Sequence, residues 1–201
     1  MKAVFILGSY IVGIGVLLAC TNTSSNNASD VHTLTLNNNN QISIIDSVAK
    51  GKYLVTIMGC NDCHSPKIMT DKGPALDEKR LLSGYDKSRP FDGYDSKTAS
   101  SGMFAVMNAE NTAYAGPWGV SYAANLTSDA SGIGNWSLDQ FKKALKEGKY
   151  KGMEGGRMLL PPMPWQNLIN ISDEDIACMF AYLQSTTPVE NVVPAPIPPV
   201  Q

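Results

Sequence analysis

The chain has 201 residues, 16 basic and 18 acidic side chains, and a net charge of −2 at pH 7. It contains no basic cluster that would suggest a nucleic-acid partner, and a mildly acidic surface suits soluble partners of mixed charge. Hydrophobic residues make up 43% of the chain, which permits a buried core, whereas 17 glycines and 12 prolines predict many turns. Four cysteines are too few for a disulfide scaffold.

The first 19 residues have the features of an export signal. Lys2 precedes an apolar run over residues 3–19, which is short for a membrane-spanning helix and ends in small residues. The run ends in "LLAC", which resembles the lipobox of bacterial lipoproteins and implies cleavage before Cys20 and acylation of that cysteine. We therefore expect a signal peptide over 1–19 and a lipid anchor on Cys20. The alternative is an ordinary signal peptide with an incidental cysteine.

Export places the protein on the periplasmic side of a bacterial membrane, and Thr21 after the lipidated cysteine favours the outer membrane. Residues 20–41 are rich in Asn, Ser and Thr and bury too little apolar surface to fold, so we expect a flexible tether. Residues 42–187 have the size of one domain. The proline-rich residues 188–201 predict an extended tail or a strap on the surface.

Three helices are expected in the domain. The first covers about 46–59. The second begins after Ser137, which can form a capping box with Gln140, and ends at Gly148. The third begins after Ser172, and the acidic residues 173–175 suit the positive end of its dipole. Residues 65–135 lack the sustained two-residue alternation of a large sheet and predict long loops.

The segment "GCNDCHSP", residues 59–66, places His64 directly after two cysteines three positions apart. This spacing suits a redox dithiol, half of a zinc site, or a covalent haem c held by thioethers at Cys60 and Cys63 with His64 on the iron. A closed zinc site would be short of ligands, because only His32 and Cys178 remain. A redox dithiol should follow a strand, whereas here a helix is expected before the motif. Haem c is favoured because its attachment requires export, and the N-terminal segment has the features of an export signal.

A six-coordinate haem needs a second axial ligand, which in electron carriers is usually a methionine far along the chain. Met163 lies between Pro162 and Pro164, which restrict the backbone and help to aim its sulfur, with Trp165 behind. Met163 is therefore our candidate, Met158 is the second choice and Met153 the third.

The chain resembles class I-type bacterial c-type cytochromes, in particular haem domains related to the cytochrome subunits of membrane-bound alcohol dehydrogenases. The resemblance covers about residues 46–186 and rests on "GKYLVTIMGCNDCHSP", "RLLSGY", "GPWGVSYAANLTSDASGIGNWSLDQFKKALKEG" and "LLPPMPWQNLINISDEDIACMFAYLQS". It implies an all-α, cytochrome c-like fold with about three main helices and long loops around one covalent haem. It also implies thioethers at Cys60 and Cys63 and axial ligation by His64 and Met163.

Further expectations follow from the same resemblance. The first and last helices should cross with Gly51 near Phe180 and Tyr182. A proline carbonyl, for which Pro74 is the candidate, should accept the Nδ1–H of the proximal histidine. Candidate contacts of the haem are Arg157, Trp118, Tyr122, Asn125 and Trp165. The chain has one Cys-x-x-Cys-His motif and therefore one expected haem.

These features predict a lipid-anchored, single-haem cytochrome without catalytic residues, which carries single electrons between periplasmic or membrane redox partners. Its donor or acceptor would be a redox protein such as a dehydrogenase or oxidase, of which it could also be a fixed subunit. If Met163 is not a ligand, the open iron would suit a haem c sensor or a peroxidase-like enzyme. A lipoprotein that binds no haem is the remaining alternative.

Overall fold

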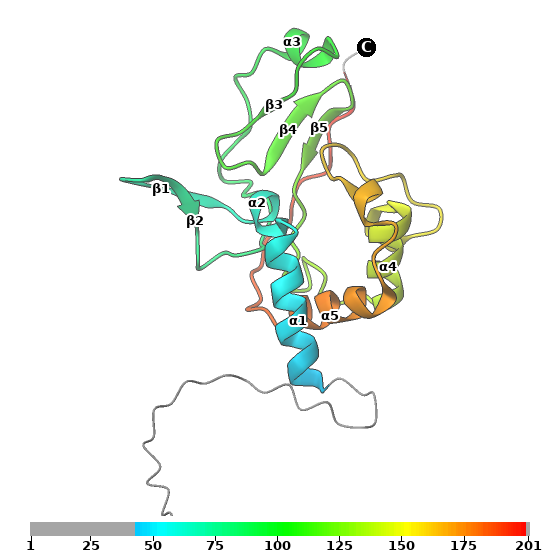
Figure 1. Ribbon diagram of the computed structural model, residues 1–201. Coiled ribbons are helices and arrows are strands. Elements are labelled where there is room, and N and C mark those ends of the chain that lie inside the picture. Colours follow the sequence, from blue (N-terminus) through cyan, green and yellow to red (C-terminus); the bar gives the residue numbers. More distant parts are fainter. Residues whose placement is uncertain (1–42, 200–201) are drawn as a thin grey trace, which may run out of the picture. The chain divides into compact units, whose positions relative to one another are not determined.

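The computed structural model describes residues 43–199 (Figure 1). The expected signal peptide, the lipid attachment at Cys20 and the expected tether lie outside the described residues. Within residues 43–199, no helix combines the length and the apolar character needed to cross a membrane.

The described residues form five α-helices, two short 3-10 helices and five strands (Figure 1). The α-helices are α1 (Ile44–Ile57), α2 (Cys60–His64), α3 (Ser96–Ser100), α4 (Leu138–Glu147) and α5 (Asp173–Gln184), and the 3-10 helices are η1 (Tyr150–Gly152) and η2 (Trp165–Leu168). The strands are β1 (Lys67–Thr70), β2 (Gly73–Leu76), β3 (Val106–Met107), β4 (Ala113–Gly116) and β5 (Gly119–Tyr122). The prediction of an all-α fold is therefore wrong.

Two small antiparallel sheets occupy the region that was expected to be irregular. β1 pairs with β2, and β3, β4 and β5 form a second sheet in that order. Tight two-residue turns close the β1–β2 and β4–β5 hairpins, and Gly73 and Gly119, directly after these turns, adopt positive φ values of 101° and 90°, which glycine takes without strain. None of these five strands exceeds four residues, and β4 is buried at every position, so neither of the two sheets shows a readable alternation of polar and apolar residues.

The three main helices follow from local sequence signals. Ser137 and Gln140 form the expected capping box before α4, and Gly148 ends that helix with a φ of 64°. The Ser172 side chain caps α5 by accepting a hydrogen bond from the Asp175 backbone. The first helix differs from its prediction because it ends at Ile57, and Gly59, with a φ of 69°, then starts the separate short helix α2.

The first and last helices, α1 and α5, cross in close contact at Gly51. A Cβ atom at this position would overlap the carbonyl of Cys178 and come within 2.8 Å of the Tyr182 Cβ. The expected approach of Gly51 to Tyr182 is thus confirmed. Phe180 instead packs on Phe141 of α4, with ring centroids 5.4 Å apart.

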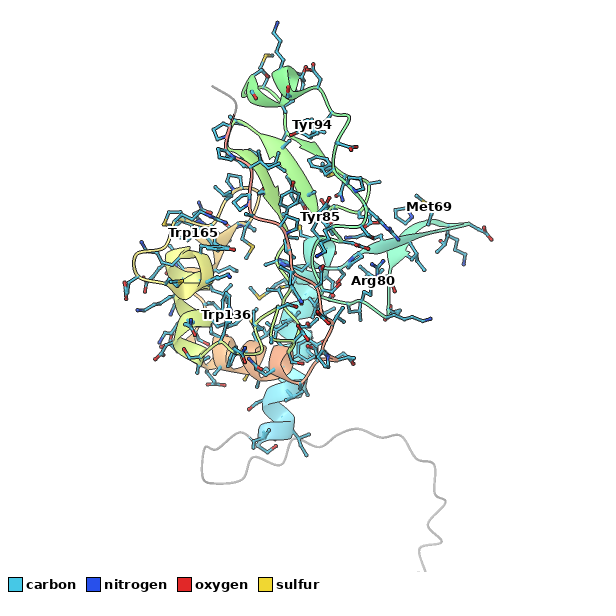
Figure 2. The ribbon with its side chains drawn as sticks, turned by 180° about the vertical axis from the view of Figure 1, so that it is seen from behind. Met69, Arg80, Tyr85, Tyr94, Trp136 and Trp165 are labelled. Carbon is cyan, nitrogen blue, oxygen red and sulfur yellow. The ribbon has the colours of Figure 1, made fainter. Side chains whose placement is uncertain are left out.

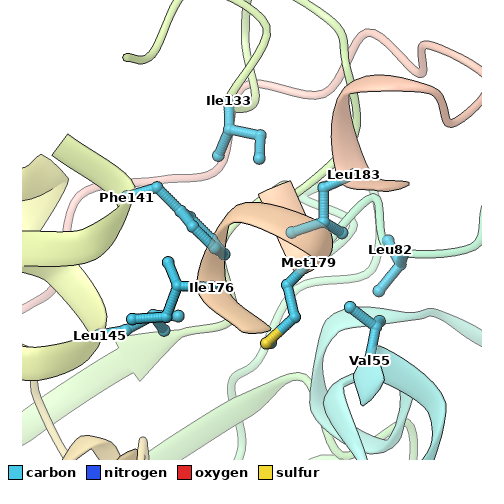
Figure 3. Packing of buried hydrophobic residues seen from close by; sticks show 8 residues of the cluster. All are labelled: Val55, Leu82, Ile133, Phe141, Leu145, Ile176, Met179 and Leu183. Atoms are coloured by element: carbon cyan, nitrogen blue, oxygen red, sulfur yellow. The ribbon is translucent and has the colours of Figure 1, made fainter. Parts of the chain in front are cut away.

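One hydrophobic cluster joins α1, α4 and α5 to two loops (Figure 3). Its buried members are Val55, Leu82, Ile133, Phe141, Leu145, Ile176, Met179 and Leu183. We call this set the main core. Cys60 of α2 and Met163, which precedes η2, both pack against it. The main core therefore connects the two segments that carry the candidate haem-binding residues.

The proline-rich C-terminal residues lie on the domain as a strap. Ile197 exchanges two backbone hydrogen bonds with Val120 of β5, at 2.8 and 3.0 Å. The C-terminal end of the chain thus runs beside β5, as the red segment in Figure 1 shows. We use the name C-terminal strap for residues 188–199.

We expect Gly51→Ala to destabilise the protein. Alanine normally favours a helix over glycine by about 1 kcal/mol, but here its methyl group would meet the backbone of α5, which cannot move aside without separating the helices. A loss of about 3 kcal/mol in the free energy of unfolding is expected, measured by denaturant titration. Gly155→Ala is the control, because that site has open space. Equal stability of the two variants would contradict the close crossing.

An ion pair also joins α1 to α5 and should make their contact sensitive to acid. The Lys50 Nζ lies 2.8 Å from Glu174 Oε1 and 2.9 Å from Asp175 Oδ1. The hydrogen bond from Lys50 lowers the pKa of Asp175 below its ordinary value of 3.8, so its stabilising effect is present above that value and is lost as the pH falls through the lowered pKa.

We therefore expect Lys50→Met to reduce the unfolding free energy at pH 7 by at most about 1 kcal/mol, because the pair is partly exposed. The difference from the unmodified protein should shrink below pH 4. Lys52→Met, at an exposed position of the same helix, should match the unmodified protein at both pH values. A pH-independent loss in the Lys50 variant would mean that the charge contributes nothing.

Candidate functional site

The two cysteines of the sequence motif are free thiols on the short helix α2, and both are half-buried. Burial against the main core raises the pKa of the Cys60 thiol to about 11. Near Cys63, the Asn111 side chain donates a hydrogen bond to the Asp62 carbonyl (3.0 Å) and lies 3.7 Å from the Cys63 sulfur. The thiols are thus held in place by the core on one side and by a loop before β4 on the other.

His64, the last residue of α2, is oriented by a backbone carbonyl. Its Nδ1 lies 2.8 Å from the carbonyl oxygen of Ala124, just after β5. Because this oxygen can only accept, Nδ1 carries the proton and Nε2 keeps the free lone pair that a metal ligand needs. Burial lowers the pKa of His64, which also favours the neutral imidazole.

The expected acceptor for His64, Pro74, is wrong. Pro74 lies in β2 opposite Met69, in a hairpin that projects away from the helices (Figure 2). The sequence therefore predicted the type of hydrogen bond but the wrong carbonyl. The sequence does not mark Ala124 as the acceptor, because every residue has a backbone carbonyl.

A tight loop supports the backbone of His64. The Gly84 N–H donates to the His64 carbonyl (2.7 Å), and the buried Ser65 hydroxyl accepts a hydrogen bond from the Leu82 N–H (2.7 Å). Gly84 has a φ of 78°, and a Cβ there would lie 2.5 Å from the Ala123 carbonyl. Only glycine fits between α2 and the segment that follows β5.

Met163 lies in a loop that two sets of hydrogen bonds hold in place. Its own N–H donates to the Leu160 carbonyl (3.2 Å), and its carbonyl accepts from the Trp165 N–H (3.0 Å). The Ser121 hydroxyl of β5 donates to the Pro161 carbonyl (2.6 Å). The second sheet thus fixes the start of this loop, and the main core contacts the Met163 side chain.

The other two candidate methionines are more exposed. Met158 pairs with Lys149 in an isolated β-bridge and has 41% of its surface exposed, and Met153 is 56% exposed. Neither is among the residues that pack on the main core. Of the three methionines, Met163 alone packs on the core that Cys60 also contacts.

Four of the five candidate haem contacts each interact with a different protein neighbour. Trp165 packs on Gly148 at the end of α4 (Figure 2), and the exposed Arg157 lies 3.9 Å from the ring centroid of Tyr150. The Trp118 indole donates to the Ser121 hydroxyl (3.1 Å). Tyr122 packs on Tyr85, with centroids 4.6 Å apart.

Asn125 is buried and its polar atoms already have partners. The amide nitrogen donates to the Val189 carbonyl (2.8 Å), and the amide oxygen accepts from the Thr127 N–H (2.9 Å). This residue therefore joins the loop after β5 to the C-terminal strap. Its surroundings explain its burial without a haem contact.

Sequence reasoning missed the residues that position the site. Ser121 supports the Met163 loop, and Asn111 with its partner Tyr114 lies beside Cys63. The Tyr114 hydroxyl lies 2.6 and 2.8 Å from the backbone and side-chain oxygens of Asn111. Desolvation by burial raises the pKa of Tyr114. All three residues belong to short strands or loops, where no periodic pattern indicated their neighbours.

This set of donors fits a covalent haem c. Two free thiols can form thioethers, the Nε2 of His64 is available as a ligand, and Met163 offers a thioether sulfur on the same core that Cys60 contacts. Among residues 43–199, no three His, Cys, Asp or Glu side chains gather as a closed zinc site would require.

Comparison with known proteins agrees with this chemistry. The family model described as cytochrome c matches residues 48–187. A nicotinate dehydrogenase subunit of Pseudomonas putida is 40% identical over 89 residues, which are 44% of this chain and 7% of that protein. The fructose dehydrogenase cytochrome subunit of Gluconobacter japonicus is 28% identical over 156 residues, or 77% of this chain and 24% of the relative.

A third relative, the gluconate 2-dehydrogenase cytochrome c subunit of Pantoea cypripedii, is 40% identical over 67 residues, which are 33% of this chain and 14% of that protein. The chain thus spans less than a quarter of the length of each of these curated relatives. The matches agree with an electron carrier in preference to an enzyme.

We expect Ser121→Ala to loosen the Met163 loop. The change leaves the Pro161 carbonyl and the Trp118 N–H without their partner, which should cost about 1–3 kcal/mol of unfolding free energy. In the oxidised, haem-loaded protein it should also weaken the red methionine–iron charge-transfer band, measured by absorption.

Ser128→Ala is the matched control, because the Ser128 hydroxyl donates to the Thr186 carbonyl at the same 2.6 Å but away from the Met163 loop. It should lower stability and leave the band intact. An unchanged band in the Ser121 variant would show that β5 does not position Met163.

Proposed function

This chain belongs to the cytochrome c family, and we propose that it is a single-haem carrier that transfers one electron at a time between protein partners. The observation that carries this proposal is the pairing on α2 of two free thiols with a histidine whose Nδ1 is hydrogen-bonded to the Ala124 carbonyl. That arrangement provides covalent attachment and one axial ligand within five residues.

The bound haem would supply a reversible one-electron change at iron. Cys60 and Cys63 would hold it covalently, and His64 and Met163 would ligate the metal from two separate segments. The Ala124 carbonyl would keep His64 in the required tautomer and raise its basicity. The main core and the Ser121 contact would restrain Met163, so that the ligands need little rearrangement when the charge changes.

We propose a dehydrogenase as one redox partner. Three relatives are named as dehydrogenase subunits, and two of them as cytochrome subunits. This chain has a single Cys-x-x-Cys-His motif, so it would contribute one haem to a longer electron-transfer chain. The second partner would be a membrane or periplasmic redox protein that accepts the electron.

We further propose that the protein is exported and held at a bacterial membrane, the outer one being favoured, through acyl chains on Cys20. The sequence "LLAC" at the end of the apolar run supports this proposal. A tether over residues 20–41 would let the domain reach its partners while raising its effective concentration near the membrane.

Axial ligation by Met163 is tested by Met163→Ala in the haem-loaded protein. We expect the reduced variant to bind carbon monoxide readily and its reduction potential to fall, because a thioether ligand stabilises the reduced iron. The unmodified protein should show sharp low-spin bands and no response to carbon monoxide. Absorption spectra of both redox states measure these changes.

Met158→Ala is the matched control and should behave like the unmodified protein, because Met158 lies in the β-bridge with Lys149. Carbon monoxide binding by the Met158 variant alone would reassign the ligand. A high-spin spectrum and prompt binding of carbon monoxide in the unmodified protein would contradict the carrier and support a gas sensor or peroxidase.

A further inference from the structure

The C-terminal strap contacts both segments that support His64. One is the loop 82–85, whose Gly84 N–H bonds to the His64 backbone, and the other is the segment 123–127, whose Ala124 carbonyl accepts from the imidazole. The matched cytochrome c family region ends at residue 187. The strap thus lies outside the matched region and contacts the histidine side of the site.

Asn191 makes the central contacts of the strap. Its side-chain amide donates to the carbonyls of Ser83 (2.7 Å) and Tyr85 (2.9 Å), one on each side of Gly84. An amide NH₂ group has two hydrogens, and here each has a carbonyl acceptor. Asn191 thus holds the carbonyl of the same peptide group whose N–H donates to His64, and also the Tyr85 carbonyl that follows it.

The strap also holds the second segment. The buried Asn125, directly after Ala124, donates through its side chain to the Val189 carbonyl (2.8 Å), and the Val189 N–H donates to the Thr127 hydroxyl (3.2 Å). The Asn191 N–H donates to the Ser131 hydroxyl (2.9 Å). These bonds keep the strap in register between the two segments.

The two segments are themselves joined beside His64. The Tyr85 N–H donates to the Ala123 carbonyl (3.0 Å), and the Leu126 N–H donates to the Leu82 carbonyl (2.8 Å). A shift of the loop 82–85 would therefore move the Ala124 carbonyl relative to the imidazole. The two segments are in close contact at Gly84, since a Cβ there would lie 2.5 Å from the Ala123 carbonyl.

We propose that the C-terminal strap fixes the proximal histidine, and that Asn191 is a positioning residue for His64 through the loop 82–85. This inference rests on the proposed function only in requiring that His64 bind the haem iron. The hydrogen bond to Ala124 makes the imidazole a stronger donor, which stabilises the oxidised iron. The strap would thus hold the reduction potential down.

The test compares Asn191→Ala with Val192→Ala in the full, haem-loaded chain. Val192 is the next residue of the strap, is uncharged and is 61% exposed. We expect Asn191→Ala to raise the reduction potential, measured by redox titration, and to speed solvent exchange of the His64 Nδ1 proton, measured by NMR of the reduced protein. Val192→Ala should leave both readings unchanged.

Two further variants keep the test decisive. Asn191→Gln, which retains the amide donors, should bring the reduction potential and the proton exchange part of the way back to the values of the unmodified protein. Ser131→Ala removes the acceptor of the Asn191 N–H and one acceptor of the Asn125 side chain (3.2 Å) but leaves the Asn191 amide on the loop 82–85, so it should shift both readings in the same direction and by less. It also replaces the Asn191 variant in the comparison if that variant does not fold.

A lower melting temperature with unchanged potential and proton exchange would reduce the strap to a structural brace and overturn the proposal. This outcome is separate from failure of the proposed function. An open sixth position in the unmodified protein would contradict the carrier, whereas the effect of Asn191 on His64 would still be measurable on the other side of the iron.

Discussion

The close crossing of α1 and α5 at Gly51 is the constraint on which the remaining structure depends. α1 leads through Gly59 into α2 with its two thiols and His64, and α5 follows directly after the segment that carries Met163 and η2. Backbone contact at Gly51 brings these two ends of the domain onto one core. A small residue at position 51 thus allows the approach of α1 and α5 through which Cys60 and Met163 contact the same core.

The middle of the chain supports the site more than it fills the core. β5 contributes Ser121 to the Met163 loop, and the segment after β5 contributes the Ala124 carbonyl to His64. One short sheet therefore steadies both candidate axial ligands. The loops of this region, which has few long elements, are tied by hydrogen bonds to α2, to the Met163 loop and to the C-terminal strap. Electron transfer benefits from such restraint, since ligands that stay in place need little reorganisation.

Sequence reasoning succeeded where the signals are local. The capping residues Ser137 and Ser172 and the terminating Gly148 act within one helical turn, so the helices they bound could be predicted. The strands could not, because they are two to four residues long and β4 is buried throughout. The acceptor for His64 was misassigned to Pro74, since the contact with Ala124 joins positions 60 residues apart and involves a backbone atom. The motif residues were recognisable because their chemistry requires fixed spacing, whereas Asn111, Ser121 and Asn191 act only through the tertiary fold.

The central claim, that His64 and Met163 hold one haem iron between them, is tested most directly by NMR of the reduced holoprotein labelled at its methionine methyl groups. The ring current of the haem displaces the methyl of an axial methionine far upfield. Of the nine methionines in the chain, our account predicts one such resonance, present in the unmodified protein and absent from Met163→Ala. A spectrum of the unmodified protein in which no methionine methyl is displaced would contradict it.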